Sequence, residues 1–262
     1  MMPQQKSTSL PHWSTIEPCM PWITYLLMAI CIGIFGYMHW LADVTHIDVT
    51  RLLYLGGVSQ DVLRQGEDGY AHFISAGFLH GGTLHLLMNM YALWIIGRKC
   101  ELYYGKAWFL VIYVVSIIGC SYFSIHLHEK PTMSVGASGA VMGLFAADLF
   151  LGKFFNPGRS VFAQDGITVL ILNLIPGIIP NVDYWGHLGG AISGGIMGFM
   201  ITQILWRMFD RASLRALSSV LALGGVAALA YTAIHMLDHY QSNIWQLKHA
   251  RNEAMLRRGY EV

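Results

Sequence analysis

The stretch Ser134-Val-Gly-Ala-Ser-Gly-Ala-Val-Met-Gly143 places the hydroxyl of Ser138 among glycines at the start of an apolar helix. A second stretch, Tyr184-Trp-Gly-His-Leu-Gly-Gly190, places the imidazole of His187 at the start of a later apolar helix. Polar side chains at membrane depth are costly and usually mark a functional site. Ser138 and His187 are therefore the first candidates for such a site, provided that these helices span a membrane.

The composition indicates an integral membrane protein. Hydrophobic residues make up 55% of the chain and charged residues only 12%, and the mean hydropathy is +0.47. A soluble domain usually carries about 25% charged residues. The net charge of +1 and the lack of a basic cluster give no support to a nucleic-acid partner. The four cysteines are scattered without paired spacing and predict neither a disulfide framework nor a metal site.

Seven apolar segments are candidates for membrane spans, which need roughly 17–25 residues. The first of these segments begins too far along the chain and is too long for a cleaved signal peptide. The second and fifth segments are short and fit only inside a bundle. The stretch of residues 42–79 mixes apolar and polar residues and predicts helical turns in the outer interface. The seven segments are residues 21–41, 83–97, 107–125, 135–152, 166–182, 185–206 and 216–236.

Lysine and arginine residues near the span ends set the orientation in the membrane. A cytoplasmic N-terminus puts most of the basic residues that flank the spans inside, among them Arg98, Lys99, Arg207 and Arg211. In this topology the second, fourth and sixth spans all run from outside to inside. Their N-terminal ends then share one level near the outer face. Four polar side chains are predicted to meet at that level: His85, Asn89, Ser138 and His187.

Small residues indicate that the fourth and sixth spans pack closely. The sixth span carries a glycine at every fourth position from 186 to 198, and the fourth span carries Gly136, Ala140, Gly143 and Ala147 on one face. Such stripes let two membrane helices approach each other. The stripes begin beside the serine and the histidine, a pair of groups that activates a serine nucleophile. The alternatives are ordinary helix packing, a serine bonded to its own helix and a structural histidine.

The pattern favours a dyad over a triad. Asp148 lies ten residues beyond Ser138, about 15 Å along the helix, and Asp183 is expected to point to the outer surface. His85 and Asn89 share one helix face. The Asn89 amide is either an oxyanion donor or part of an interhelical hydrogen bond. No His-Glu-x-x-His motif occurs, which argues against a zinc intramembrane protease, and no metal or organic cofactor is expected.

These motifs resemble those of the rhomboid family of intramembrane serine proteases, in order, over about residues 60–200. The run Gly136-Ala-Ser-Gly139 resembles the family's nucleophile motif, and Gly186-His-Leu-Gly-Gly190 resembles its histidine motif. The stretch Phe78-Leu-His-Gly-Gly-Thr-Leu-His-Leu-Leu-Met-Asn-Met90 resembles its second-span signature, and Gly97, Glu101 and Gly105 resemble the end of that span.

The resemblance implies Ser138 as nucleophile and His187 as general base, with His85 and Asn89 beside the Ser138 backbone amide in an oxyanion site. It also implies an all-α polytopic membrane protein: a rhomboid-like six-helix bundle plus one C-terminal transmembrane helix. We expect a cytoplasmic segment at residues 1–20, the protease core at 21–206, a linker and extra span at 207–236 and a tail at 237–262. The segment after residue 239 is either an interfacial helix or a disordered end.

Two positions depart from the family pattern. Ala71-His72 stands where the family often has Trp-Arg in the outer loop, which affects the hydrogen bonding inside that loop. Met142 replaces an aromatic residue that packs on the catalytic histidine in some members. Tyr184 or Trp185 is the alternative support for the ring of His187.

The sequence thus predicts an intramembrane serine endopeptidase that cleaves transmembrane protein substrates near the outer membrane face, with substrate entering sideways from the lipid bilayer. One alternative is a catalytically silent rhomboid-like protein that binds or escorts membrane proteins. A second is a small transporter with a midplane site built from broken helices. The expected location is a bacterial cytoplasmic membrane, with the N-terminus in the cytoplasm. The sequence defines neither a natural substrate nor an oligomeric state.

Overall fold

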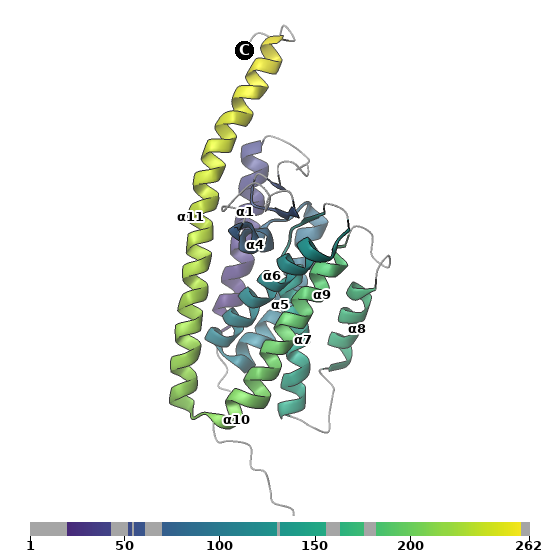
Figure 1. Cartoon of the computed structure of the whole chain (residues 1–262), viewed down its shortest axis with the longest axis vertical. Coiled ribbons are helices and arrows are strands. Elements are labelled where there is room, and N and C mark those ends of the chain that lie inside the picture. The colour runs from purple at the N-terminus through teal and green to yellow at the C-terminus, as the bar shows by residue number, and fades with distance from the viewer. Residues whose placement is uncertain are drawn as a thin grey trace, which may run out of the picture.

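The structure is a computed structural model that describes residues 20–42, 52–53, 55–60, 70–129, 132–155, 163–175 and 182–257. It is almost entirely helical, and the prediction of an all-α polytopic membrane protein is confirmed (Figure 1). The elements in chain order are α1 (Trp22–Ala42), β1 (Val58–Ser59), α4 (His72–Ser75), η3 (Ala76–Phe78), α5 (Thr83–Tyr104), α6 (Lys106–Leu127), β2 (Met133–Ser134), α7 (Ser138–Phe155), α8 (Ala163–Leu174), α9 (Tyr184–Phe199), η4 (Met200–Leu205), α10 (Trp206–Met208) and α11 (Arg211–Arg257).

The helices follow the apolar segments of the sequence. In the described part of the chain, four windows are long and apolar enough to cross a membrane: Trp22–His39, Lys106–Leu127, Tyr184–Met208 and Ala212–Leu237. Helix α5 contains charged residues near its end, and the apolar part of α7 is shorter. Helix α7 is surrounded by neighbouring helices, whereas α5 packs one face against the bundle and exposes Leu84, Leu87 and Tyr91 on the other.

Helix α7 occupies the centre of the bundle. It contacts α5, α6, α8 and α9, and Figure 1 shows these helices gathered around it. Its residues are apolar on several faces, and Ala140, Leu144 and Ala147 are fully buried. A helix that is apolar all round is expected in such a position. The N-terminal end of α7, where Ser138 lies, is therefore fixed by neighbours on several sides.

The backbones of α7 and α9 are in direct contact. Gly139 faces Gly190, Gly143 faces Gly194 and Ala147 faces Gly198, so the two helices run parallel in constant register. A methyl group added at Gly190 would lie only 2.8 Å from the backbone carbon of Gly139. The small-residue stripes of the sequence thus form the predicted close interface.

A buried carboxylate joins the first span to the end of α5. Glu101 is fully buried and accepts hydrogen bonds from the backbone amides of Ile23 (3.0 Å) and Thr24 (2.8 Å) and from the Thr24 hydroxyl (2.8 Å). The first amides of a helix lack partners within the helix, and a negative charge there also favours the helix dipole. Glu101 therefore caps α1 from a neighbouring helix.

The outer segment before α5 is tied to the loop that carries Ser138. Strands β1 and β2 pair antiparallel, with Val58 opposite Ser134. His72 donates from Nδ1 to the Gly57 carbonyl (2.9 Å), and Ser75 donates to the Gly56 carbonyl (2.7 Å). His72 thus supplies hydrogen bonding inside the loop in spite of the missing Trp-Arg pair. The predicted helical turns are present as α4 and η3, while residues 43–51 and 61–69 lie outside the described residues.

Helix α11 is a single helix of 47 residues. It runs along the outside of α6 and α4 and continues well beyond the rest of the bundle (Figure 1). Its length of roughly 70 Å exceeds the thickness of a bilayer, about 40–45 Å with headgroups. The predicted tail up to residue 257 is therefore a continuation of this helix, and the boundary placed at residue 236 falls inside it.

Candidate active site

Ser138 is the first residue of α7 and is held by the loop before it. Gly136 adopts φ +117°, a conformation that favours glycine, and a methyl group there would lie 2.7 Å from His85 Nε2. The amide of Gly136 donates to the Ala76 carbonyl (2.8 Å). The loop before Ser138 thus packs between η3 and the side chain of His85, and only a glycine fits at position 136.

His187 lies in the first turn of α9, with 5% of its surface exposed. Its backbone amide donates to the Asp183 carbonyl (2.9 Å), and its ring Nδ1 lies 3.4 Å from the Asn173 carbonyl at the end of α8. A carbonyl oxygen only accepts, so this contact requires the proton on Nδ1. Nε2 then keeps its lone pair, which is the tautomer that a general base needs.

The parallel packing of α7 and α9 places Ser138 and His187 at the same end of the helix pair. Ser138 precedes Gly139, which touches Gly190, and His187 lies one turn before Gly190. Among the described residues no hydrogen bond joins the Ser138 hydroxyl to His187. Such bonds are often long without substrate and tighten in the reacting complex.

His85 and Asn89 lie on the face of α5 that meets the loop before Ser138. The Asn89 Nδ2 atom is 3.8 Å from the position of a methyl group on Gly136. Asn89 is buried and donates one N–H to the His85 carbonyl (2.9 Å). His85 is close enough to His187 for the two rings to interact electrostatically. All four residues singled out in the sequence therefore lie around the start of α7.

His80 is a buried neighbour of this cluster. Its ring centroid is 5.2 Å from that of His85, and neither of its ring nitrogens has a hydrogen-bond partner in the described part of the chain. Burial, with a smaller contribution from His85, lowers the pKa of His80 to about 3. The ring is therefore neutral and leaves no positive charge beside His85. The sequence showed only that His80 does not share a face with His85.

The expectation that Asp183 points to the outer surface is wrong. Its side chain is 14% exposed and turns back onto the helix that it precedes. Oδ1 accepts from the Gly186 amide (2.8 Å) and from His128 Nε2 (2.8 Å). Asp183 is thus the N-cap of α9. An aspartate three residues before a glycine-rich helical segment is a readable capping signal, whereas the approach of His128 from α6 is not visible in the sequence.

Tyr184, one of the two aromatic candidates for supporting His187, packs against other rings. Its centroid is 5.5 Å from that of His128 and 5.3 Å from that of Trp185. Met142 is buried, with 3% of its surface exposed. In the described ring contacts, Tyr184 therefore packs against His128, the residue that bonds Asp183.

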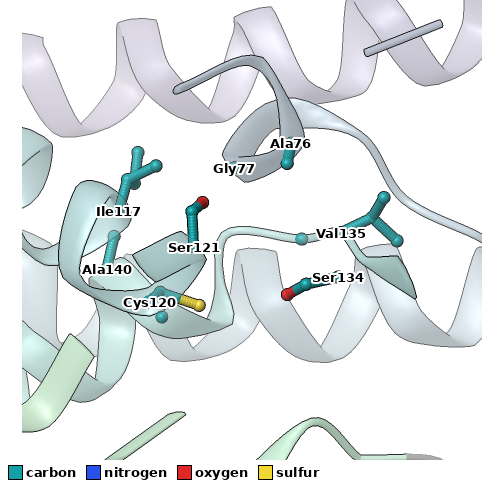
Figure 2. Close-up of a pocket in the computed structure, with 10 residues that line it drawn as sticks. Ala76, Gly77, Ile117, Cys120, Ser121, Ser134, Val135 and Ala140 are labelled. Carbon is teal, nitrogen blue, oxygen red and sulfur yellow. The ribbon is translucent and has the colours of Figure 1, made fainter. Parts of the chain in front are cut away.

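A small cavity of about 10 Å³, with room for about one water molecule, borders the loop before Ser138. Figure 2 shows Ser121, Ser134 and Cys120 around it. The Ser121 hydroxyl donates to the Phe73 carbonyl (2.8 Å), and serine oxygens offer partners to a water molecule. The cavity is lined by Ala76, Gly77, Ile117, Cys120, Ser121, Ser134, Val135, Gly136, Gly139 and Ala140.

Several known proteins are similar in sequence to this chain. The family model of the Rhomboid domain matches residues 67–204. Rhomboid protease GluP of Bacillus subtilis is 30% identical, over 86% of this chain and 43% of that protein. Rhomboid protease AarA of Providencia stuartii is 30% identical, over 67% of this chain and 70% of that protein. RHOMBOID-like protein 4 of Arabidopsis thaliana is 33% identical, over 56% of this chain and 38% of that protein. The chain spans less than half the length of GluP and of the plant protein.

Proposed function

The chain belongs to the rhomboid family, and we propose that it is an intramembrane serine endopeptidase that cleaves transmembrane proteins near the outer membrane face. The observation that carries this proposal is the direct backbone contact between α7 and α9 at Gly139 and Gly190. That contact puts the Ser138 hydroxyl and the His187 imidazole at one end of two parallel helices.

In the proposed reaction the Ser138 oxygen attacks the carbonyl carbon of a substrate peptide bond. His187 Nε2 takes the hydroxyl proton and returns it to the leaving amine, so that the C–N bond breaks and an acyl ester on Ser138 remains. A water molecule, deprotonated by the same nitrogen, then hydrolyses the ester. The contact between Nδ1 and the Asn173 carbonyl supports this assignment, because it keeps Nε2 free as the base.

The oxyanion of the tetrahedral intermediate is assigned to donors around the start of α7. The backbone amide of Ser138, at the N-terminus of that helix, has no earlier helical partner. Asn89 uses one N–H within α5 and has a second to offer, and His85 lies against Gly136. One well-placed donor is worth roughly 3–4 kcal/mol of transition-state stabilisation.

Transmembrane helices are the proposed substrates, and we expect them to approach sideways from the bilayer. Helix α8 contacts α7 and α9 and exposes Ile171 and Leu172. A peptide helix hides its carbonyls, so a substrate must unwind locally before Ser138 can attack it. The N-in topology, the bacterial cytoplasmic membrane and the predicted limits of the N-terminal segment and the protease core belong to this proposal.

The transporter alternative loses its main support. It needs charged groups near the bilayer centre, and Asp148 was the candidate. Asp148 is buried and forms an ion pair with Lys99 (2.5 Å) between α5 and α7, so it already has a structural partner. The other alternative, a catalytically silent rhomboid-like protein that binds membrane proteins, is distinguished from a protease by the cleavage experiment below.

The decisive experiment uses purified protein with a fluorescently labelled transmembrane substrate. We expect cleavage by the wild type and at least a thousandfold loss in Ser138→Ala and in His187→Ala, each with a melting temperature close to wild type. Cleavage that survives Ser138→Ala contradicts the proposed nucleophile. Binding of substrate without any cleavage by the wild type identifies a silent binding protein.

A further inference from the structure

Asp183 connects three separate parts of the molecule at the start of α9. Its Oδ1 accepts from the Gly186 amide in α9 and from His128 Nε2 just after α6, both at 2.8 Å. The hydroxyls of Ser124 in α6 and Ser134 in β2 lie beside the same carboxylate. Oδ2 is buried and has no partner of strict hydrogen-bond geometry in the described part of the chain. The carboxylate is thus held in one orientation from several sides.

His128 is itself fixed in place. Its backbone carbonyl accepts from Gln60 Nε2 (2.9 Å), which also donates to the Ile125 carbonyl (2.8 Å). The edge of its ring packs against Tyr184, the first residue of α9. The ring is only 15% exposed. His128 is therefore a rigid support that ties Asp183 to the end of α6.

The carboxylate of Asp183 is ionised at neutral pH. Burial by itself raises its pKa, but the nearby hydroxyls of Ser124 and Ser134 and the bonds from the Gly186 amide and His128 together hold the pKa below its ordinary value. A negative charge therefore lies one turn before His187, whose own amide bonds the Asp183 carbonyl. The N-terminal end of a helix is electropositive and disfavours a protonated ring. A fixed carboxylate at the same place offsets that effect.

We propose that Asp183 is a positioning residue for His187, resting on the proposed protease function. Anchored by His128, Asp183 fixes the first turn of α9, and its charge stabilises the imidazolium that forms when His187 takes the proton of Ser138. The carboxylate thus stabilises the charge on His187, as the acidic residue of a catalytic triad does, but without contacting the imidazole. It keeps its own charge throughout, and only the proton between Ser138 and His187 moves.

The test separates charge from helix capping. Asparagine is as good an N-cap as aspartate, so Asp183→Asn keeps the cap and removes the charge. We expect kcat and the rate of fluorophosphonate labelling of Ser138 to fall about five- to twentyfold, with KM unchanged. His128→Ala is expected to lower kcat in the same way, and His128→Gln, which keeps a donor, to recover most of it.

Asp210 provides the matched control. It caps α11 by accepting from the amides of Ala212 (2.8 Å) and Ser213 (2.9 Å) and is exposed, so Asp210→Asn should leave kcat unchanged. Wild-type kcat in Asp183→Asn, or an equal loss in Asp210→Asn, overturns the charge role.

Hydrogen exchange tests the anchoring role independently of activity. The Gly186 and His187 amides should lose at least tenfold protection in Asp183→Ala, and unchanged protection overturns the anchor. A wild-type protein that does not react at Ser138 refutes the protease function instead, while the exchange data still decide whether Asp183 anchors α9.

Discussion

Replacing Gly190 with alanine tests the contact on which the proposed active site depends. The added methyl group would meet the backbone of Gly139, whose carbon and α-carbon lie 2.8 Å and 2.9 Å from the new atom. Backbone cannot move aside as a side chain does, so α7 and α9 must separate. Overpacking of this kind costs about 1–3 kcal/mol, against a gain of up to about 1 kcal/mol in helix propensity. We expect a net loss of about 1–2 kcal/mol.

Activity should suffer more than stability in this variant. The contact lies one turn from His187 and next to Ser138, and a shift of about 1 Å in reacting groups costs up to about a hundredfold in rate. Fluorophosphonate labelling of purified protein gives the rate, and thermal unfolding in detergent gives the stability. We expect labelling to slow at least tenfold, with a loss of only a few degrees in melting temperature.

Gly195→Ala is the matched control on the same helix. A methyl group at Gly195 would lie 3.4 Å from Ala146 Cβ and 3.9 Å from Phe150, which is ordinary packing. This variant should gain stability through helix propensity and keep its labelling rate. If Gly190→Ala and Gly195→Ala behave alike, the reasoning from backbone contact to active-site geometry is refuted.

Further substitutions probe the supports of the bundle and the site. Glu101→Ala removes the buried cap of α1 and should cost about 3–5 kcal/mol in unfolding free energy, whereas an undiminished melting temperature would contradict the capping role. Lys99→Met should lower the unfolding free energy by about 3–5 kcal/mol, because it leaves the buried Asp148 without its ion-pair partner. The double variant with Asp148→Leu should recover most of this loss in the same assay. No recovery would show that the two side chains are not coupled. Asn89→Ala should slow substrate turnover about a hundredfold with little loss of stability, and an unchanged rate would remove it from the oxyanion site. Because the folded-state pKa of Asp183 lies below its ordinary value, its stabilisation is complete above about pH 4 and is lost as the pH falls further; Asp183→Asn should flatten this part of the curve of melting temperature against pH.

The helices and their packing were largely readable from the sequence. Runs of apolar residues predicted the helices because the hydrocarbon imposes a minimum length on a span, and four windows in the described part of the chain are long and apolar enough to cross a membrane. The glycines at positions 190 and 194 predicted close packing because few other residues let backbones touch. Ser138 and His187 were expected at the same end of their helices because the fourth and sixth predicted spans run in the same direction, and α7 and α9 are indeed parallel.

The contacts between distant segments were not readable in the same way. His128 bonds Asp183 across 55 residues, and Glu101 caps a helix 77 residues earlier. Such pairs depend on where helix ends meet in space, and neither periodicity nor spacing reports that. The continuation of α11 through the predicted tail was not foreseen, because its polar residues fit an interfacial helix and a disordered end equally well.

Mapping the site of fluorophosphonate modification by mass spectrometry tests directly whether His187 activates Ser138. We expect one modified peptide in the wild type, carrying the label on Ser138, and no label in a His187→Ala variant that still melts at the wild-type temperature. Full labelling of Ser138 in that variant, or a label on another residue in the wild type, would contradict it.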